Sequence, residues 1–191
     1  ISSDIGNNCA IGNAYPTFEE TRKYLAPGLF GPCGYGLPSV VGAKIGRPDV
    51  PVVGFSGDGA FGIAVNELTA IGREEWPAVT QIVFRNYQWG AEKRNSTLWY
   101  DDNFVGTELD TQVSYAGIAK ACGLQGVVAK TMDELTEALH TAIKDQMENG
   151  KTTLIEAMIN QELGEPFRRD AMKKPVAIAG ISVSDMREQV V

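Results

Sequence analysis

The chain has 191 residues, of which 43% are apolar and 21% are charged, and its formal net charge is −7. This length and composition suit one α/β domain with a sizeable core. No apolar run approaches the length of a membrane span, and no signal peptide is recognisable. The acidic balance, without a basic patch, argues against a nucleic-acid-binding protein. A small anionic ligand would need a metal ion, a helix N-terminus or a single arginine to neutralise it.

The cysteines and the single histidine exclude further classes of protein. Cys9, Cys33 and Cys122 are odd in number and widely spaced, and they form no C-x-x-C pair. Zinc and iron–sulfur sites are therefore not expected, and a reducing cytoplasm is the expected setting. His140 is the only histidine and falls in a predicted helix. A lone histidine argues against Ser-His-Asp and Cys-His hydrolases.

The two ends of the chain differ from its middle. Residues 1–4 have the pattern of a strand already under way, so we expect the chain to be part of a longer protein. Residues 1–163 are predicted to form one domain. The alternation of strands and helices stops after this point, and residues 164–191 are predicted to form a C-terminal arm that packs on a neighbouring domain or subunit.

Predicted strands and helices alternate along the chain, with short connections. The strands are expected at 51–56, 79–84, 124–129 and 152–159, and the helices at 36–45, 63–73, 113–121 and 131–148. This pattern predicts a doubly wound parallel sheet flanked by helices, with ligands bound beyond the carboxyl ends of the strands. Thr131 and Glu134 form a capping box for the last helix. The polar and aromatic stretch 92–110 is predicted to be a long loop at the ligand edge.

Two glycines flank an aspartate where a buried strand turns into a helix. The residues at this turn are Gly57, Asp58, Gly59, Ala60 and Phe61. Glycines let the backbone approach a ligand closely, and the free N–H groups at the start of a helix attract phosphate. A carboxylate at this position would repel a phosphate unless a divalent cation lay between them. Because Mg²⁺ often bridges carboxylates to phosphates, the turn indicates a magnesium site that holds a phosphorylated ligand.

The next predicted strand ends in further oxygen ligands. Asn86 offers a side-chain oxygen, and the main-chain carbonyl of Gln88 can turn toward the same point. Because the two strands are expected to be neighbours in a parallel sheet, we predict Asp58, Asn86 and Gln88 as the metal ligands. The simpler interpretation is a turn aspartate between its glycines and an asparagine that ends a strand.

This pattern resembles the signature of thiamine-diphosphate (ThDP) enzymes, in which Gly-Asp-Gly is followed, after a stretch of similar length, by two asparagines. Here 26 residues separate Gly59 from Asn86, and Arg85 stands where the first asparagine is usual. The metal-binding role belongs to the second position, which Asn86 keeps. The likeness covers residues 1 to about 160. It implies ThDP and Mg²⁺ as cofactors and identifies the chain as the diphosphate- and metal-binding domain.

Two segments before this signature resemble other cofactor contacts of the family. In the Gly-rich segment 28–38, the likeness places the carbonyl of Gly31 on the amine of the aminopyrimidine. Cys33 stands at the position of the bulky apolar residue that holds the cofactor bent, although cysteine is smaller than usual. Asn7 and Asn8 stand where family members place polar side chains on the diphosphate. The simpler interpretation of both segments is a turn, with a buried cysteine in the second.

A helix that begins at 88–91 is expected to direct its N-terminus at the thiazolium. The resemblance therefore places Gly90 and Ala91 on the cofactor. Ala91, Glu92 and Asn95 are candidates for the substrate pocket by their position.

Within the family, residues 4–8, 85–95 and 174–181 are most similar to the acetyltransferases that act on sulfoacetaldehyde. The resemblance implies that sulfoacetaldehyde and phosphate are converted to acetyl phosphate and sulfite. Both co-substrates are anions, so Lys93 and Arg94 are candidates for the pocket, although solvated charges on a helix face are the more ordinary interpretation.

The family's activating glutamate lies in a separate N-terminal domain that comes from the partner subunit. The resemblance therefore implies a homo-oligomer, dimer or tetramer, with shared active sites. No catalytic residue is expected in this chain, and the isolated chain is expected to be inactive.

Three other functions stay open. Acetolactate synthase, or another 2-oxoacid enzyme, would keep the cofactor and change the substrate. An NAD-binding domain would need G-x-G-x-x-G after the first strand, which the segment 6–8 does not match. A non-catalytic module that keeps only the fold would show no metal-dependent cofactor binding.

Overall fold

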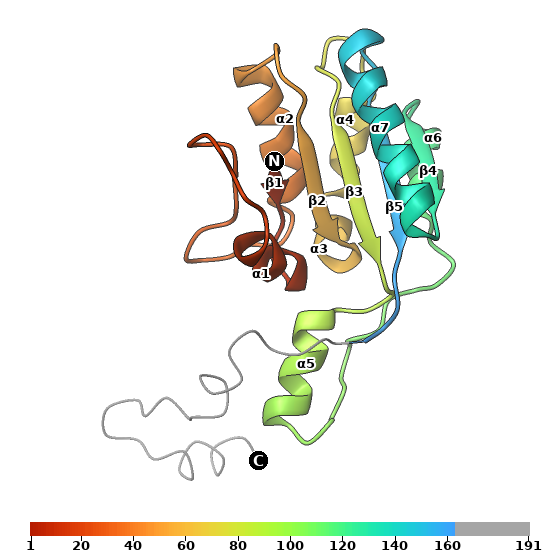
Figure 1. Ribbon diagram of the computed structural model, residues 1–191. Helices are drawn as coiled ribbons and strands as arrows, with labels where there is room; N and C mark the ends of the chain where they lie inside the picture. Colours follow the sequence, from red (N-terminus) through yellow and green to blue (C-terminus); the bar gives the residue numbers. More distant parts are fainter. Residues whose placement is uncertain (163–191) are drawn as a thin grey trace.

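The computed structural model describes residues 1–162, which form a five-stranded sheet flanked by helices. The strand order is β1-β2-β3-β5-β4, and all neighbouring strands are parallel (Figure 1). The predicted doubly wound parallel sheet is therefore confirmed. The strands are β1 (Ser2–Ser3), β2 (Val53–Gly57), β3 (Thr80–Arg85), β4 (Gln125–Ala129) and β5 (Thr153–Met158).

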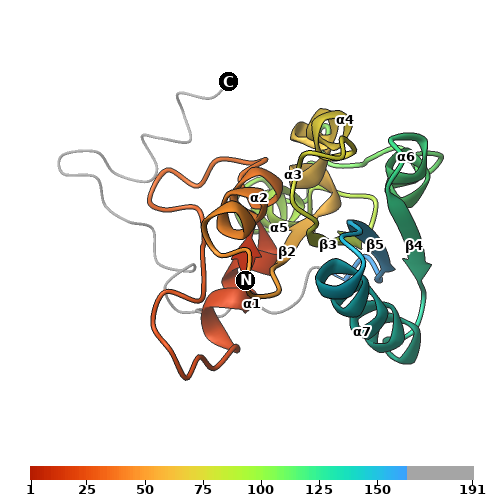
Figure 2. The same ribbon diagram turned by 90° about the horizontal axis from the view of Figure 1, so that it is seen from above.

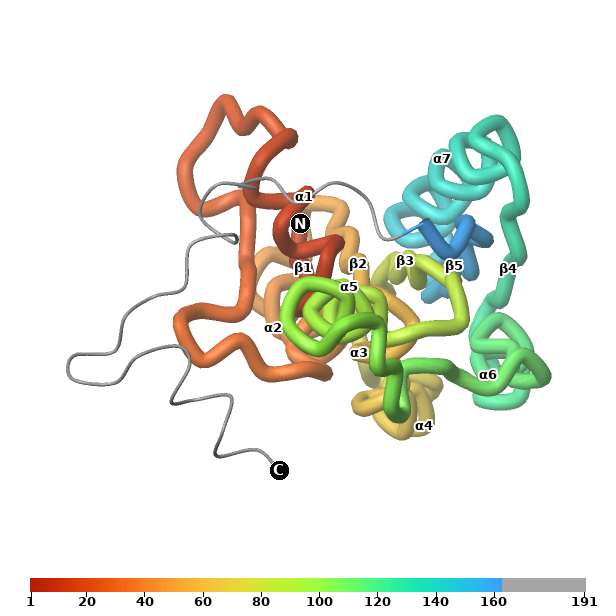
Figure 3. The backbone as a smooth tube through the Cα atoms, turned by 90° about the horizontal axis from the view of Figure 1, so that it is seen from below, coloured from red at the N-terminus to blue at the C-terminus, as the bar shows by residue number. Residues whose placement is uncertain are grey.

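Helices cover both faces of the sheet. Figure 2 shows α2, α3, α4 and α6 on one face and α1 and α7 on the other. Helix α5 covers neither face and lies beyond the carboxyl ends of the strands (Figures 1 and 3). No helix within residues 1–162 is long and apolar enough to cross a membrane. The helices are α1 (Asn7–Ala14), α2 (Gly36–Gly46), α3 (Asp58–Ile63), α4 (Leu68–Ile71), α5 (Gly90–Trp99), α6 (Tyr115–Ala121) and α7 (Met132–Glu148).

The central strands β3 and β5 are buried at nearly every position, so both of their faces are covered. Val83 and Leu154 pack into the core under α2, α4 and α6, and Ile82 and Ile155 pack under α7. Neighbouring residues of a strand thus enter opposite cores, because side chains alternate across a sheet. This two-sided burial fixes the register of β3 against β5 and β2.

The capping box of the last helix is present with one change of partner. The hydroxyl of Thr131 accepts a hydrogen bond from the N–H of Glu134 at 3.2 Å, as predicted. The Glu134 carboxylate accepts from the N–H of Lys130 at 2.6 Å and so reaches one residue further back than expected. Helix α7 then runs to Glu148, which confirms its predicted end.

The predicted helix 63–73 is wrong in its bounds. The chain is already helical from Asp58, and α3 ends at Ile63. The N–H of Ala64 bonds to the carbonyl of Phe61, a three-residue bond that tightens the last turn. A 3-10 turn and the short helix α4 follow. The change of direction lets both Phe61 and Leu68 reach the same core.

Two helices were not expected at their full extent. Helix α1 begins where a turn was the simpler interpretation, and α5, whose predicted start at 88–91 is confirmed, continues through the first half of the predicted loop 92–110. Neither has a strong apolar face, and no residue of α5 is fully buried. Apolar periodicity, the main signal of a helix in a sequence, is therefore missing. The predicted arm 164–191 lies outside the described residues.

Candidate functional site

The ends of β2 and β3 bring the two halves of the predicted metal site together. Gly57 pairs with Phe84 in the parallel register, so Asp58 and Arg85 follow side by side at the carboxyl edge. The backbone N–H of Asn86 donates to Oδ2 of Asp58 at 3.1 Å, and that of Tyr87 donates at 2.7 Å. Asp58 and Asn86 therefore meet directly, as the sheet geometry predicts.

The Asp58 carboxylate uses its two oxygens unequally. Oδ2 accepts three hydrogen bonds, from the N–H groups of Asn86 and Tyr87 and from Nη1 of Arg85 at 3.1 Å. Oδ1 accepts one bond, from the N–H of Gly59 at 3.0 Å. A carboxylate oxygen has two lone pairs, so Oδ1 keeps an orbital for a cation. The arginine in place of the usual asparagine thus supplies a supporting hydrogen bond to Asp58.

Arg85 is buried in a cage of polar and aromatic groups. Its side chain is 1% exposed, and its guanidinium lies 4.2 Å from the ring centre of Tyr87 and 5.1 Å from that of Tyr115. Nη2 donates to the carbonyls of Asp110 at 2.6 Å and Val113 at 3.0 Å. Nε lies 3.5 Å from a carboxylate oxygen of Glu156. One planar side chain therefore links the end of β3 to the segment before α6.

Burial raises the pKa of Asp58 above its usual range, and the hydrogen bonds from Tyr87 and Arg85 oppose that shift. The side chain is 1% exposed, so its charge is expensive without a partner. Arg85 provides one partner inside the protein. A cation at Oδ1 would provide another on the side of the solvent.

The turn after Asn86 presents the carbonyl of Gln88. Tyr87 adopts a left-handed conformation with φ 62°, which is uncommon for a residue other than glycine. Leu109 donates to the carbonyl of Tyr87, and Trp89 donates to that of Thr107. Gln88 lies between these two bonds, so its own carbonyl faces away from the segment 107–109. Within residues 1–162 no backbone N–H outside the regular elements donates to it.

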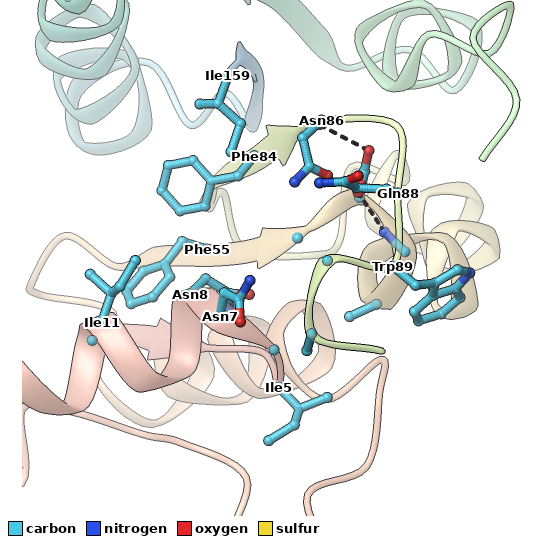
Figure 4. Close-up of a pocket in the computed structure, with 18 of the residues that line it drawn as sticks. Ile5, Asn7, Asn8, Ile11, Phe55, Phe84, Asn86, Gln88, Trp89 and Ile159 are labelled. Carbon is cyan, nitrogen blue, oxygen red and sulfur yellow. Dashed lines mark hydrogen bonds between the residues drawn. The ribbon is translucent and has the colours of Figure 1, made fainter. Parts of the chain in front are cut away.

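A cavity of about 840 Å³ opens at this edge of the sheet. Its polar end is formed by Asn7, Asn8, Asn86 and Gln88 (Figure 4), and Asp58, which also lines the cavity, accepts a hydrogen bond from the N–H of Asn86. Its other end is apolar and contains Ile11, Phe55, Phe84 and Ile159 (Figure 4), and Ile82 lines the cavity as well.

Three helices begin at the polar end, and none has a capping side chain. Helices α1, α3 and α5 follow Gly6, Gly57 and Trp89, which make no side-chain cap hydrogen bond. The first N–H groups of a helix lack intrahelical partners and carry partial positive charge. The cavity wall includes the first residues of all three: Asn7, Asn8, Asp58, Gly59, Ala60, Gly90, Ala91 and Glu92. This end of the cavity therefore favours an anion.

The charged side chains in the wall are nevertheless all acidic. They are Asp58, Glu92 and Glu162, and no lysine or arginine of the described part of the chain lines the cavity. Lys93 lies outside the wall, where its ammonium bonds to Oε1 of Gln88 at 3.1 Å and pairs with Glu108. An anion held by the helix N-termini would meet the Asp58 carboxylate. A divalent cation between them removes that repulsion.

The donor set fits Mg²⁺ better than a transition metal. It comprises one carboxylate oxygen, one amide oxygen and one main-chain carbonyl, and hard oxygen ligands of this kind suit Mg²⁺, which keeps several waters or phosphate oxygens. Within residues 1–162 no group of three or more His, Cys, Asp or Glu side chains could hold a metal. The residues present therefore fit a magnesium ion that is shared with a phosphorylated ligand.

The two asparagines of α1 have different surroundings. Asn8 is buried, and its amide donates to the hydroxyl of Ser3 at 3.2 Å and the carbonyl of Asp4 at 2.9 Å. Asn7 has a buried side-chain oxygen without a partner among the described residues. Its amide lies in the cavity wall, as Figure 4 shows. Asn7 is thus free to serve a ligand, whereas Asn8 holds the helix to the end of β1.

Of the other predicted site residues, Cys33 lies in the cavity wall, whereas Gly31 and Asn95 lie outside it. Cys33 lines the cavity, and its side chain is largely exposed. Partial burial of the thiol raises its pKa, and the negative charges of Asp4 and Glu92 raise it further. Gly31 has a left-handed backbone with φ 59° and is not part of the wall. Asn95, in the second turn of α5, is not part of the wall either. Asn95 was a candidate by its position in the chain, but the cavity reaches only the first turn of the helix.

The sequence did not reveal three residues that shape the site. Trp89 lies so close to Gly59 that a Cβ atom there would be 2.7 Å from the indole. The hydroxyl of Tyr115 donates to the carbonyl of Asp58 at 2.9 Å. Glu156 accepts hydrogen bonds from Ser114 at 2.8 Å and from the N–H of Ala116 at 3.1 Å. A charged residue within an apolar strand was the one available signal, since a buried charge needs a partner.

Known proteins are similar to this chain along its length. The protein described as "Sulfoacetaldehyde acetyltransferase" of Roseovarius nubinhibens is 87% identical over all of this chain, which spans 32% of its length. The "Acetolactate synthase large subunit" of Corynebacterium glutamicum is 30% identical over 96% of this chain, and the match covers 28% of that protein's length. The chain thus spans about a third of the length of these relatives.

A solved structure shows the same fold. The ThDP-dependent 4-hydroxybenzoylformate decarboxylase of Rhodococcus jostii matches with a TM-score of 0.63 at 26% identity, over 74% of this chain and 25% of that one. Residues 4–157 match the family described as "Thiamine pyrophosphate enzyme, C-terminal TPP binding domain". The chain therefore belongs to the thiamine pyrophosphate enzyme family, as a C-terminal TPP binding domain.

Proposed function

We propose that the chain is the ThDP- and Mg²⁺-binding domain of an acetyltransferase that converts sulfoacetaldehyde and phosphate to acetyl phosphate and sulfite. The observation that carries the proposal is the polar end of the cavity, where three uncapped helix N-termini meet the carboxylate of Asp58. Within residues 1–162, no lysine or arginine lines the cavity. This arrangement suits a diphosphate only together with a divalent cation. The 87% identity to the relative named for this reaction supports the choice of substrate.

The metal ligands in this proposal are Oδ1 of Asp58, the side-chain oxygen of Asn86 and the carbonyl of Gln88. Asp58 is fixed before the metal arrives, because Oδ2 already accepts three hydrogen bonds. The left-handed turn at Tyr87 presents the Gln88 carbonyl. Such a rigid carboxylate loses little freedom on binding, which favours a tight site.

The diphosphate would lie on the N-termini of α1, α3 and α5. Gly57 and Gly90 let the backbone approach it, and Gly59, Ala60 and Ala91 lie in the same wall. Asn7, and more weakly Asn8, would add side-chain bonds from α1.

The ring end of the cofactor would face Cys33 and the loop that contains Gly31. ThDP, when bound, supplies a nucleophilic carbon for the reaction. The chain's own part is to hold the cofactor, orient it and keep water away from it. Cys33 is small, and the wall beside it also contains Ile5, which packs against Gly31.

The substrate side would be formed by Ala91 and Glu92, while Asn95 would lie outside direct contact. Because no cationic side chain of residues 1–162 lines the cavity, groups that bind the sulfonate and the phosphate would come from the rest of the enzyme. The same holds for the activating glutamate. We therefore propose a cytoplasmic homo-oligomer, dimer or tetramer, with shared sites, in which the isolated chain is inactive.

The test is an assay of the full-length enzyme with sulfoacetaldehyde, phosphate, ThDP and Mg²⁺, in which sulfite release is followed. We expect release that depends on ThDP, Mg²⁺ and phosphate and that is abolished by Asp58→Ala. Asp49→Ala is the matched control, because Asp49 is an exposed carboxylate paired with Arg47 on the surface.

The other outcomes separate the alternatives. Acetolactate formation from pyruvate without sulfite release would keep the metal site and overturn the substrate. An enzyme that binds no ThDP in the presence of Mg²⁺ would be a module that keeps only the fold.

A further inference from the structure

Asp4 is a buried carboxylate that the predicted site does not use. It follows β1 directly and is 0% exposed. None of the ion pairs found in residues 1–162 involves it. A buried carboxylate without a cation must be stabilised by hydrogen-bond donors. The identity of these donors shows what Asp4 holds in place.

The donors come from three separate segments of the chain. Oδ1 accepts from the N–H of Ile5 at 2.8 Å and from that of Gly34 at 3.1 Å. Oδ2 accepts from the N–H of Gly36 at 2.9 Å and, at 3.4 Å, from the hydroxyl of Ser56. Two of the four donors therefore belong to the loop that carries Cys33, about thirty positions further along the chain.

Asp4 also replaces a missing helix cap. Tyr35 precedes α2 and makes no side-chain cap hydrogen bond. The carboxylate of Asp4 binds the first N–H of that helix from outside, at Gly36. A negative charge at a helix N-terminus is favourable. The approach is close, since a Cβ atom on Gly36 would lie 3.0 Å from the Cβ of Asp4.

Few apolar side chains pack on this loop. Leu29 and Phe30, which precede it, are 108% and 93% exposed, and the apolar side chains that approach the loop include Ile5 at Gly31 and Ile63 at Gly34. Gly31 and Gly34 have left-handed backbones, with φ 59° and 83°, which few other residues adopt. The loop therefore depends on its hydrogen bonds for its shape, and Asp4 accepts two of them from positions on either side of Tyr35.

Asp4 lies between two parts of the cavity wall. Ile5, Asn7 and Asn8, which line the cavity, follow Asp4 in the chain. Cys33, which also lines it, directly precedes Gly34, whose N–H donates to Asp4. We propose that Asp4 is a positioning residue that sets the loop 31–36 against the ring end of ThDP. This inference rests on the proposed function, because it requires the cofactor to occupy the cavity.

The proposal separates the two ends of the cofactor. Asp4 holds the loop that faces the rings, whereas the diphosphate end depends on Asp58, Asn86 and the helix N-termini. Loss of Asp4 should therefore weaken the binding of ThDP and leave the binding of inorganic pyrophosphate with Mg²⁺ unchanged. A purely structural defect would weaken both ligands together.

The experiment uses the full-length enzyme with Asp4→Asn. Asparagine has nearly the same shape, but its NH₂ group faces an N–H donor and cannot accept. At saturating Mg²⁺ we expect the dissociation constant for ThDP to rise by about tenfold or more. The dissociation constant for pyrophosphate should stay within about twofold, since it reports only the diphosphate end. In the cofactor-free enzyme, Cys33 should react faster with iodoacetamide, as followed by mass spectrometry.

Asp145→Asn is the matched control. Asp145 also accepts side-chain hydrogen bonds through both oxygens, from Asn149 at 2.7 Å and Gln125 at 3.1 Å, and it lies on α7. The Asp145→Asn substitution should leave the dissociation constants for ThDP and pyrophosphate and the rate of Cys33 alkylation unchanged. Gly34→Ala serves as a second variant if Asp4→Asn does not fold, because it strains the same loop at φ 83° and leaves Asp4 intact. It should reproduce the separation between ThDP and pyrophosphate.

The outcomes are distinguishable. Unchanged ThDP affinity in the folded Asp4→Asn enzyme, or equal loss for ThDP and pyrophosphate, would overturn the positioning role. If Asp4→Asn does not fold, the test falls to Gly34→Ala. A Gly34→Ala enzyme that binds ThDP as tightly as the natural enzyme would also overturn the positioning role. A natural enzyme that binds no ThDP would instead overturn the proposed function.

Discussion

The contact between Gly59 and Trp89 gives a prediction with a computable size. In Gly59→Ala, the new Cβ would lie 2.7, 2.8 and 3.0 Å from three carbons of the Trp89 indole. Carbon atoms in favourable contact are about 3.5–4.0 Å apart, so the indole must move by roughly 1 Å. The backbone of Trp89 is fixed by hydrogen bonds to Thr107 and Lys93 at 2.8 Å each. The strain therefore falls on the side chain and on the start of α5.

The expected cost follows from two opposing effects. Overpacking of this kind costs about 1–3 kcal/mol, and replacement of a helical glycine by alanine returns about 0.5–1 kcal/mol. The net loss of unfolding free energy should be about 1 kcal/mol at the middle of both ranges and at most about 2.5 kcal/mol. The first turn of α5 also lines the cavity, so the ThDP dissociation constant at saturating Mg²⁺ should rise by about tenfold.

The assay compares urea unfolding and ThDP binding of the full-length enzyme with those of Gly42→Ala. Gly42 lies inside α2, and a Cβ atom there would have no neighbour within 4 Å. This control should gain stability by about 0.5–1 kcal/mol and keep its affinity for ThDP. If Gly59→Ala proves as stable as Gly42→Ala and binds ThDP equally well, Trp89 does not transmit the shape of the turn to α5.

Three further predictions concern single side chains. Thr131→Ala should lower the unfolding free energy by about 1 kcal/mol in urea titrations, because it removes the cap of α7, whereas Thr136→Ala on the same helix should change it by less than about 0.5 kcal/mol. Hydrogen bonds from Asn149 and Gln125 lower the pKa of Asp145 from 3.8. The stabilising effect of its carboxylate should therefore be full above pH 3.8 and disappear as the pH falls through the folded pKa. In urea titrations, the unfolding free energies of Asp145→Asn and the natural enzyme should differ less near pH 3 than at pH 6. The pKa of Cys33 is raised above 9.0 by burial first and by Asp4 and Glu92 next, so iodoacetamide should alkylate it more slowly than a model thiol at pH 8, and saturating ThDP with Mg²⁺ should slow it further; a faster reaction than the model thiol would contradict the raised pKa.

The sheet and the meeting of Asp58 with Asn86 were predictable because they follow from general geometry. Strands buried on both faces are rich in apolar residues, and β2, β3 and β5 are so apart from polar positions such as Gln81 and Glu156. The carboxyl ends of neighbouring parallel strands share one edge, so residues that follow them must lie close together. The last helix was predictable because Thr131 and Glu134 give a local signal.

Other parts of the site depend on tertiary contacts that leave no local pattern. Helix α5 lies beyond the carboxyl ends of the strands and buries no residue fully, so its sequence lacks a periodic apolar face. Asp4 bonds to Gly34 and Gly36, which are about thirty residues away, and nothing near Asp4 indicates that partner. Asn95 was proposed from its position in the chain alone, and the limit of the cavity at the first turn of α5 is set by packing.

The register of β2 against β3 has a consequence for how related chains can vary in length. Gly57 is paired with Phe84, and this pairing alone makes Asp58 and Asn86 neighbours. The connection that returns to β3 passes through exposed residues at 72–76, where an insertion would alter the interval between the two motifs without moving either. A deletion of one residue within β3 would instead exchange the two faces of that strand. The number of residues between the motifs is therefore free to drift, whereas the pairing of the two strand ends is not.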